Sequence, residues 1–171
     1  ATATLTVTDQ PTPPACIPNQ PLATWSFASG FNVNAPTADA TPAVTVSAQA
    51  GAGLTPAEGA DLQGPGNASW QTDNVDNSGS LNTGLNQYFE FTIDTTGLSE
   101  IDVSFWAERT PQGPASVQLV YGPTGTENTS VGAFTITGTP TQFSATNLVA
   151  DLNTTGNTTF RLYVYDANNN S

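Results

Sequence analysis

The sequence has no histidine, no lysine and no methionine, and its only basic side chains are Arg109 and Arg161. Fourteen acidic side chains bring the formal net charge of the 171 residues to −12 at pH 7. Imidazole acid–base catalysis, histidine metal ligation and nucleophiles activated by histidine or lysine are therefore excluded. Two isolated arginines cannot form the cationic surface that nucleic acids and anionic membranes require. We expect a protein that is not an enzyme and binds no nucleic acid.

Cysteine and long apolar runs are scarce as well. Cys16 is the only cysteine, so no disulfide can form within the chain. Its thiol can pair with another chain, stay free, or act as a small half-buried hydrophobic group. No apolar run reaches the roughly 18 residues of a transmembrane helix, and we expect no membrane insertion.

Small polar residues take the place of charge. Charged residues make up 9% of the chain, while threonine occurs 28 times and asparagine 15 times. Threonine favours strands, and glycine, proline and asparagine favour turns. A surface solvated by threonine and asparagine rather than by lysine and glutamate is unusual for a cytosolic protein. The composition predicts an all-β extracellular protein, either secreted or held at the cell surface.

The chain divides into an arm and a body. Residues 1–21 combine a short period-two pattern, in which Ala3, Leu5 and Val7 alternate with threonines, with a proline-rich linker. Residues 22–171 form the expected domain, with a long loop at 51–66. We predict strands at residues 22–27, 44–46, 68–70, 87–94, 100–108, 115–121, 131–137, 141–147 and 158–166. Short strands separated by turn signals predict an antiparallel β-sandwich of the jelly-roll type, here with an N-terminal extension strand.

Four segments, residues 22–27, 86–92, 104–114 and 159–165, carry a resemblance. They resemble bacterial extracellular jelly-roll domains that are similar to carbohydrate-binding modules and occur in secreted and surface proteins. The resemblance implies a further strand after the position of residue 171. Without that strand the sandwich has an open groove, for which we predict a lining that includes Phe160, Leu162 and Val164.

The N-terminal strand suits such a groove. Thr2, Ala3, Leu5 and Val7 can fill it within the same domain or in a neighbouring copy. The first functional hypothesis is therefore a structural subunit of a pilus-like surface filament or layer, a homopolymer built by donor-strand complementation. The alternative for the groove is that the last strand lies beyond residue 171.

Aromatic residues support a second hypothesis. If the outer faces of two strands align, Trp106, Tyr163 and Tyr165 form a flat surface for stacking sugar rings, with Arg161 as a hydrogen-bond donor. The protein would then be a polysaccharide-binding accessory module of a larger secreted enzyme. Covering loops or an assembly interface would account for the same aromatic residues.

Loop residues suggest a calcium site and glycosylation sites. Asp73 and Asp76, with Glu58 and Asp61 as further ligands, form the best cluster for calcium, although Asx-rich loops also form plain turns. Glycosylation sequons predicted to lie in loops or at strand ends occur at Asn67, Asn128, Asn153 and Asn157.

Overall fold

The computed structural model of the chain describes residues 23, 25, 27, 30–38, 45–59, 69–96, 101–127, 129–148 and 156–167. Within them lie strands and one 3-10 helix: β1 (Val46–Ala50), β2 (Pro56–Gly59), β3 (Ser69–Thr72), η1 (Thr83–Leu85), β4 (Tyr88–Asp94), β5 (Ile101–Ala107), β6 (Pro114–Pro123), β7 (Thr129–Thr135), β8 (Thr141–Leu148) and β9 (Asn157–Ala167). Every strand pair is antiparallel. The prediction of an all-β fold with antiparallel sheets is confirmed.

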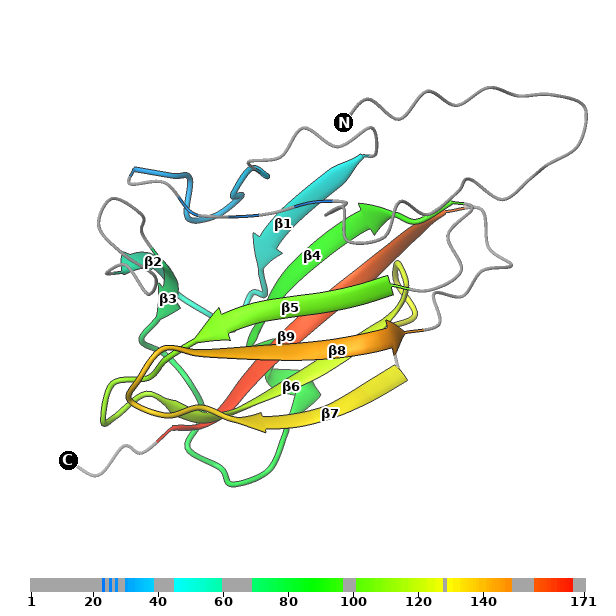
Figure 1. Ribbon diagram of the computed structural model, residues 1–171. Helices are drawn as coiled ribbons and strands as arrows, with labels where there is room; N and C mark the ends of the chain where they lie inside the picture. The colour runs from blue at the N-terminus through cyan, green and yellow to red at the C-terminus, as the bar shows by residue number, and fades with distance from the viewer. Residues whose placement is uncertain are drawn as a thin grey trace, which may run out of the picture.

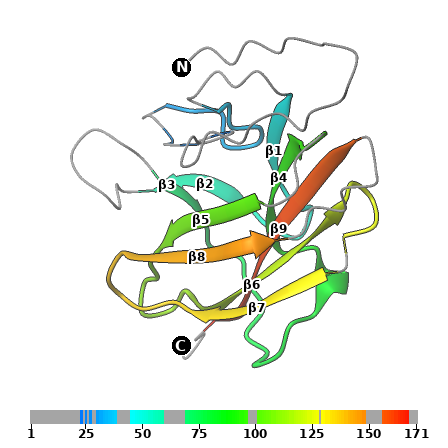
Figure 2. The same cartoon turned by 45° about the vertical axis from the view of Figure 1, so that its right-hand side comes forward.

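The strands form one large sheet and two small ones. The large sheet has the order β1-β4-β9-β6-β7, and β5-β8 and β2-β3 are two-stranded. In Figures 1 and 2, β5 and β8 lie in front of the large sheet and cross β9 and β6. The β5–β8 sheet therefore covers one face of the large sheet, and the opposite face of β5–β8 points away from it.

Two apolar clusters fill the space between these layers. The first joins the inward side chains of β5 and β8 to β6 and β9: Ile101, Leu119, Tyr121, Ala145, Leu148 and Phe160. The second lies toward the other end of the same face and comprises Leu54, Val75, Val117, Ile136, Val164 and Ala167. Burial of these side chains is the main force that holds the two layers together.

Aromatic packing covers the β4 side of the large sheet. The Trp70 ring of β3 lies 4.6 Å from the Phe89 ring, and the Trp25 ring lies 5.0 Å from Phe91. The indole nitrogen of Trp70 donates a hydrogen bond of 2.8 Å to the carbonyl of Val33. The β2–β3 sheet is thus fixed to β4 by rings rather than by strand pairing.

The structure corrects three of the predicted elements. Strand β1 covers Val46–Ala50, whereas the sequence predicted a strand at residues 44–46. Strand β2 lies within residues 51–66, which the sequence predicted to be a loop. Phe27, predicted to end the first strand, has a φ of 52°, which is the left-handed region and not extended backbone. The segment around Gly53 runs close to η1. Glycine permits this approach, because a Cβ at this position would lie 1.8 Å from the Leu85 carbonyl oxygen. The predicted N-terminal strand and linker lie outside the described residues.

Candidate functional site

The outward side of the β5–β8 sheet carries an exposed aromatic ring, that of Trp106. Along β5 and β8 inward and outward side chains alternate, and the outward ones are exposed. We name this surface the Trp106 face, and it consists of Asp102, Ser104, Trp106, Gln142, Ser144 and Thr146. Trp106 is 43% exposed, the largest value among the large hydrophobic side chains that the structure describes. An indole combines a large apolar ring with an N–H donor, which suits it to contact a ligand or a partner.

The register of the two strands holds Trp106 in this outward position. Trp106 is paired with Gln142, and Ser104 is paired with Ser144. On the inward side, the Phe105 ring lies 5.5 Å from both the Phe134 and the Phe143 rings. A slip of one residue would expose Phe105 and bury Trp106 and its polar neighbours, so inward packing specifies the outward face.

One end of the Trp106 face is fixed by a bulge. The pairing of β5 with β8 shifts between Ile101 and Val103, and Asn147 opposite has a φ of 56°. The Asp102 carboxylate accepts a hydrogen bond of 2.9 Å from the Asn147 backbone N–H at this irregularity. Asp102 therefore stays on the outward face in a defined position.

The other end of the Trp106 face carries a second carboxylate. Glu108 directly follows β5 and is exposed, and from the alternation along β5 we infer that it lies on the same side as Trp106. The next residue, Arg109, is half-buried, and its guanidinium donates a hydrogen bond of 3.4 Å to the Gly113 carbonyl. The charges on and beside the Trp106 face are thus negative.

The structure does not bring the predicted sugar-stacking residues together. Trp106 lies on the outer side of the β5–β8 sheet, whereas Tyr163, Tyr165 and Arg161 lie on β9 in the large sheet. Tyr163 is buried, and its ring lies 5.1 Å from the Tyr88 ring. The outer faces of β5 and β9 point in opposite directions because their apolar sides pack against each other.

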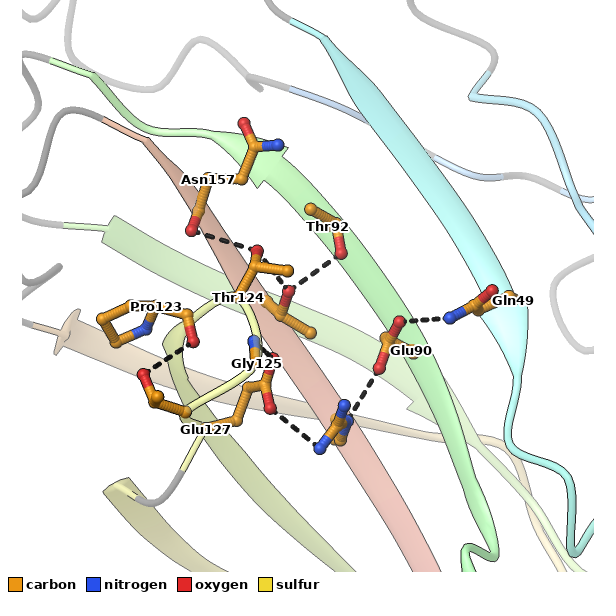
Figure 3. Close-up of polar contacts among 11 residues, drawn as sticks. Gln49, Glu90, Thr92, Pro123, Thr124, Gly125, Glu127 and Asn157 are labelled. Carbon is orange, nitrogen blue, oxygen red and sulfur yellow. Dashed lines mark hydrogen bonds and ion pairs between the residues drawn. The ribbon is translucent and has the colours of Figure 1, made fainter.

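Arg161 is the centre of an ionic cluster on the far side of the large sheet. Its guanidinium lies 2.7 Å from the Glu90 carboxylate and 2.8 Å from the Glu127 carboxylate, with the Tyr88 ring centre 4.6 Å away. The Gln49 side chain donates a hydrogen bond to Glu90, so the cluster spans β1, β4, β9 and the loop after β6, as Figure 3 shows. Its two carboxylates are 10% and 3% exposed, and the cluster therefore fastens a loop to the sheet rather than presenting a donor to a ligand.

The protonation states in this cluster follow from its surroundings. Burial by itself would lower the pKa of Arg161, but the hydrogen bond to Glu90 and the interactions with Tyr88 and Glu127 outweigh it and raise the pKa. Burial also raises the pKa of the Tyr88 phenol, an effect that Arg161 partly opposes. At neutral pH the guanidinium is charged and the phenol is neutral, which suits a ring that faces a cation.

The residues predicted to line a groove lie in the core. Phe160 packs with Ile101, Ala145 and Leu148 of the facing sheet, and Val164 belongs to the second cluster. Leu162 is partly buried against both clusters. Strand β9 is paired on both sides, to β4 and to β6. The chain's own strands thus cover these side chains, and the strand predicted to be donated, with Thr2, Ala3, Leu5 and Val7, lies outside the described residues.

The loop predictions stay predictions. Asp73 is exposed, and Asp76 accepts a hydrogen bond from the Ser78 hydroxyl. The described residues include no group of three or more acidic, cysteine or histidine side chains suited to a metal. Asn157 is exposed at the start of β9, while Asn67, Asn128, Asn153 and Cys16 lie outside the described residues. The described part of the chain also has no helix with the length and hydrophobicity needed to cross a membrane.

Known proteins give no guide to the role of the Trp106 face. No protein-family model, no curated protein and no solved structure matches the chain.

Proposed function

We propose that this domain is a non-catalytic, extracellular polysaccharide-binding module and that the Trp106 face is its binding surface. The observation that carries the proposal is the 43% exposure of Trp106 on the outer side of a sheet. We also propose that the strands follow the jelly-roll order predicted from the sequence. The lack of histidine and lysine supports a binding role over a catalytic one.

The neighbours of Trp106 have the chemistry that a sugar ring requires. One face of a pyranose ring presents C–H groups, which lose unfavourable contact with water when they stack on an indole. The hydroxyls and edge groups of the sugar then need hydrogen-bond partners, which the Gln142 amide and the Ser104 and Ser144 hydroxyls supply. Gln142 lies directly opposite Trp106 in the strand register. Because the serine side chains are short, they leave the indole accessible to a flat ligand.

Replacing Trp106 by alanine is expected to weaken polysaccharide binding about tenfold or more, the loss of roughly 1.4 kcal/mol or more of contact energy. The melting temperature should change little, because the removed ring contributes little to the core. Retardation in gels containing soluble cellulose, xylan or chitin derivatives measures the binding, and differential scanning calorimetry measures the stability. Leu85→Ala is the matched control, since it removes another large apolar side chain of the described residues, 40% exposed on η1. A Trp106→Ala protein that is retarded as strongly as the wild type would contradict the proposal.

A second candidate function rests on the edge of β5. Among the described residues, β5 is hydrogen bonded only to β8, and no described strand pairs with its other edge. The inward side chains Ile101, Val103 and Phe105 present an apolar side that an added strand would extend. The alternation of Ala3, Leu5 and Val7 with threonines matches this pattern, and an unpaired edge is a site for strand addition. Assembly of this kind leaves the outward Trp106 face open, so both functions can coexist.

The assembly function predicts that Leu5→Asp/Val7→Asp abolishes filaments, because it places charge in the apolar contact. Thr4→Asp/Thr6→Asp is the matched control, since it adds the same charge to the opposite face of the strand and should leave assembly intact. Negative-stain microscopy and sedimentation of the full chain measure the outcome. Filaments formed equally well by the Leu5→Asp/Val7→Asp protein would exclude donation of this strand.

A further inference from the structure

The charge pattern of the Trp106 face limits the chemical class of ligand that this surface can bind. Two carboxylates lie on the β5 side, Asp102 before Trp106 and Glu108 after it. The β8 side of the face is uncharged and carries Gln142, Ser144 and Thr146. Neither arginine belongs to this surface, since Arg161 lies on β9 and Arg109 is half-buried beside Gly113. An exposed indole next to uncompensated negative charge is an arrangement that attracts cations.

Strand geometry places one carboxylate within reach of a sugar stacked on Trp106. Side chains two residues apart on the same side of a strand are separated by about 7 Å. Glu108 follows Trp106 at this spacing, and its flexible side chain can reach a substituent at the edge of the ring. Asp102 is two such steps away on the other side of Trp106, where the Asn147 N–H holds its carboxylate in place. A glycan that follows β5 would therefore pass both carboxylates.

We propose, on the premise that the Trp106 face binds glycan, that its ligand is a polysaccharide whose sugars carry free, protonated amino groups, such as a polymer of glucosamine. The amine forms an ion pair with Glu108, and its positive charge also favours the indole face. A neutral sugar leaves the exposed carboxylate in water and gains no ion pair from it. An acidic polysaccharide would be repelled by both carboxylates and by a chain of net charge −12.

The proposal is tested with one oligosaccharide in two chemical forms. A glucosamine hexasaccharide and the same compound after N-acetylation differ in charge but share a backbone, and calorimetric titration at low salt measures the affinity of each. We expect the wild type to bind the amine form about fivefold tighter, the effect of an exposed ion pair. At an ionic strength of about 0.5 M this preference should become smaller, because salt weakens an exposed ion pair.

Two variants test whether Glu108 causes the preference for the amine form. Glu108→Gln should lower the preference to twofold or less and leave the affinity for the acetylated form unchanged. Asp73→Asn is the matched control, since it removes one exposed carboxylate outside the Trp106 face and should keep the preference. A wild type that binds the acetylated form as tightly as the amine form would overturn the amine proposal, while loss of binding in Trp106→Ala would still support glycan recognition.

Two further outcomes separate the remaining alternatives. Binding of both oligosaccharides that is unaffected by Trp106→Ala would overturn the proposed function itself. A lysine hexapeptide that binds as tightly as the glucosamine hexasaccharide, with the same dependence on Trp106 and Glu108, would overturn the assignment of the ligand as a glycan. We expect the peptide to bind at least fivefold more weakly, because it offers no hydroxyls to Gln142, Ser104 and Ser144.

Discussion

Replacing Arg161 by methionine is expected to lower the free energy of unfolding by about 3–5 kcal/mol, a large part of the 5–15 kcal/mol typical of a domain. Methionine keeps much of the side-chain volume but removes the positive charge. The Glu90 and Glu127 carboxylates, 10% and 3% exposed, then stay buried without their shared partner. Urea denaturation followed by tryptophan fluorescence measures the change.

Neutralising the Glu90 carboxylate, which has lost its positive partner, should reverse part of this loss of stability. In the Arg161→Met background, Glu90→Gln is expected to recover about 1–2 kcal/mol, because a neutral amide is less costly to bury than a carboxylate. Gln49 lies against Glu90 and can still form a hydrogen bond with the new amide. A loss below about 1 kcal/mol in Arg161→Met would show that the cluster is solvated and does not fasten the loop after β6.

Replacing Leu119 by alanine is expected to lower the free energy of unfolding by about 3–5 kcal/mol. Leu119 on β6 is 0% exposed and lies in the first apolar cluster, between the large sheet and the β5–β8 sheet. The smaller side chain leaves a cavity that paired strands cannot easily close, because hydrogen bonds to β7 and β9 hold the β6 backbone. Urea denaturation again measures the change.

Leu85→Ala is the control for this substitution, since it removes the same atoms from a leucine that is 40% exposed on η1. Its effect should stay within about 0.5 kcal/mol, as is usual for surface positions. Equal effects of Leu119→Ala and Leu85→Ala would contradict the packing of β5–β8 on the large sheet.

Periodicity predicted the fold where strands are half-buried. The alternation in residues 87–94, 100–108 and 158–166 correctly indicated β4, β5 and β9 and the side chains that share a face on each. It failed at β2, whose Pro-Ala-Glu-Gly sequence has no alternation and is positioned by pairing with β3. It also failed at Phe27, where packing against the Phe31 and Trp70 rings outweighs the extended conformation that the pattern favours.

The candidate site could be predicted only in part. Period-two spacing correctly placed Trp106 with Asp102 and Ser104 and opposite the apolar side of β5. It carries no information on which strands share a sheet, so it could not separate Trp106 from Tyr163 and Tyr165. The contact of Arg161 with Glu127 depends on the path of the loop after β6, which no local pattern encodes. The scarcity of basic residues was a usable signal for Arg161, which is paired with two carboxylates. It was not one for Arg109, which has no ion pair among the described residues and donates to the Gly113 carbonyl.

Nuclear magnetic resonance during titration with the glucosamine hexasaccharide shows directly whether the Trp106 face binds glycan. The chain has three tryptophans, and their indole N–H signals report on three different environments. Trp70 donates its indole N–H to Val33, and the Trp25 ring packs on Phe91, whereas Trp106 is exposed. We predict that the Trp106 indole signal and the backbone amides of Ser104, Gln142 and Ser144 shift on binding, while the Trp25 and Trp70 signals do not. Shifts confined to other parts of the domain, or no shift with any of the glycans used above, would exclude the Trp106 face as a glycan-binding surface.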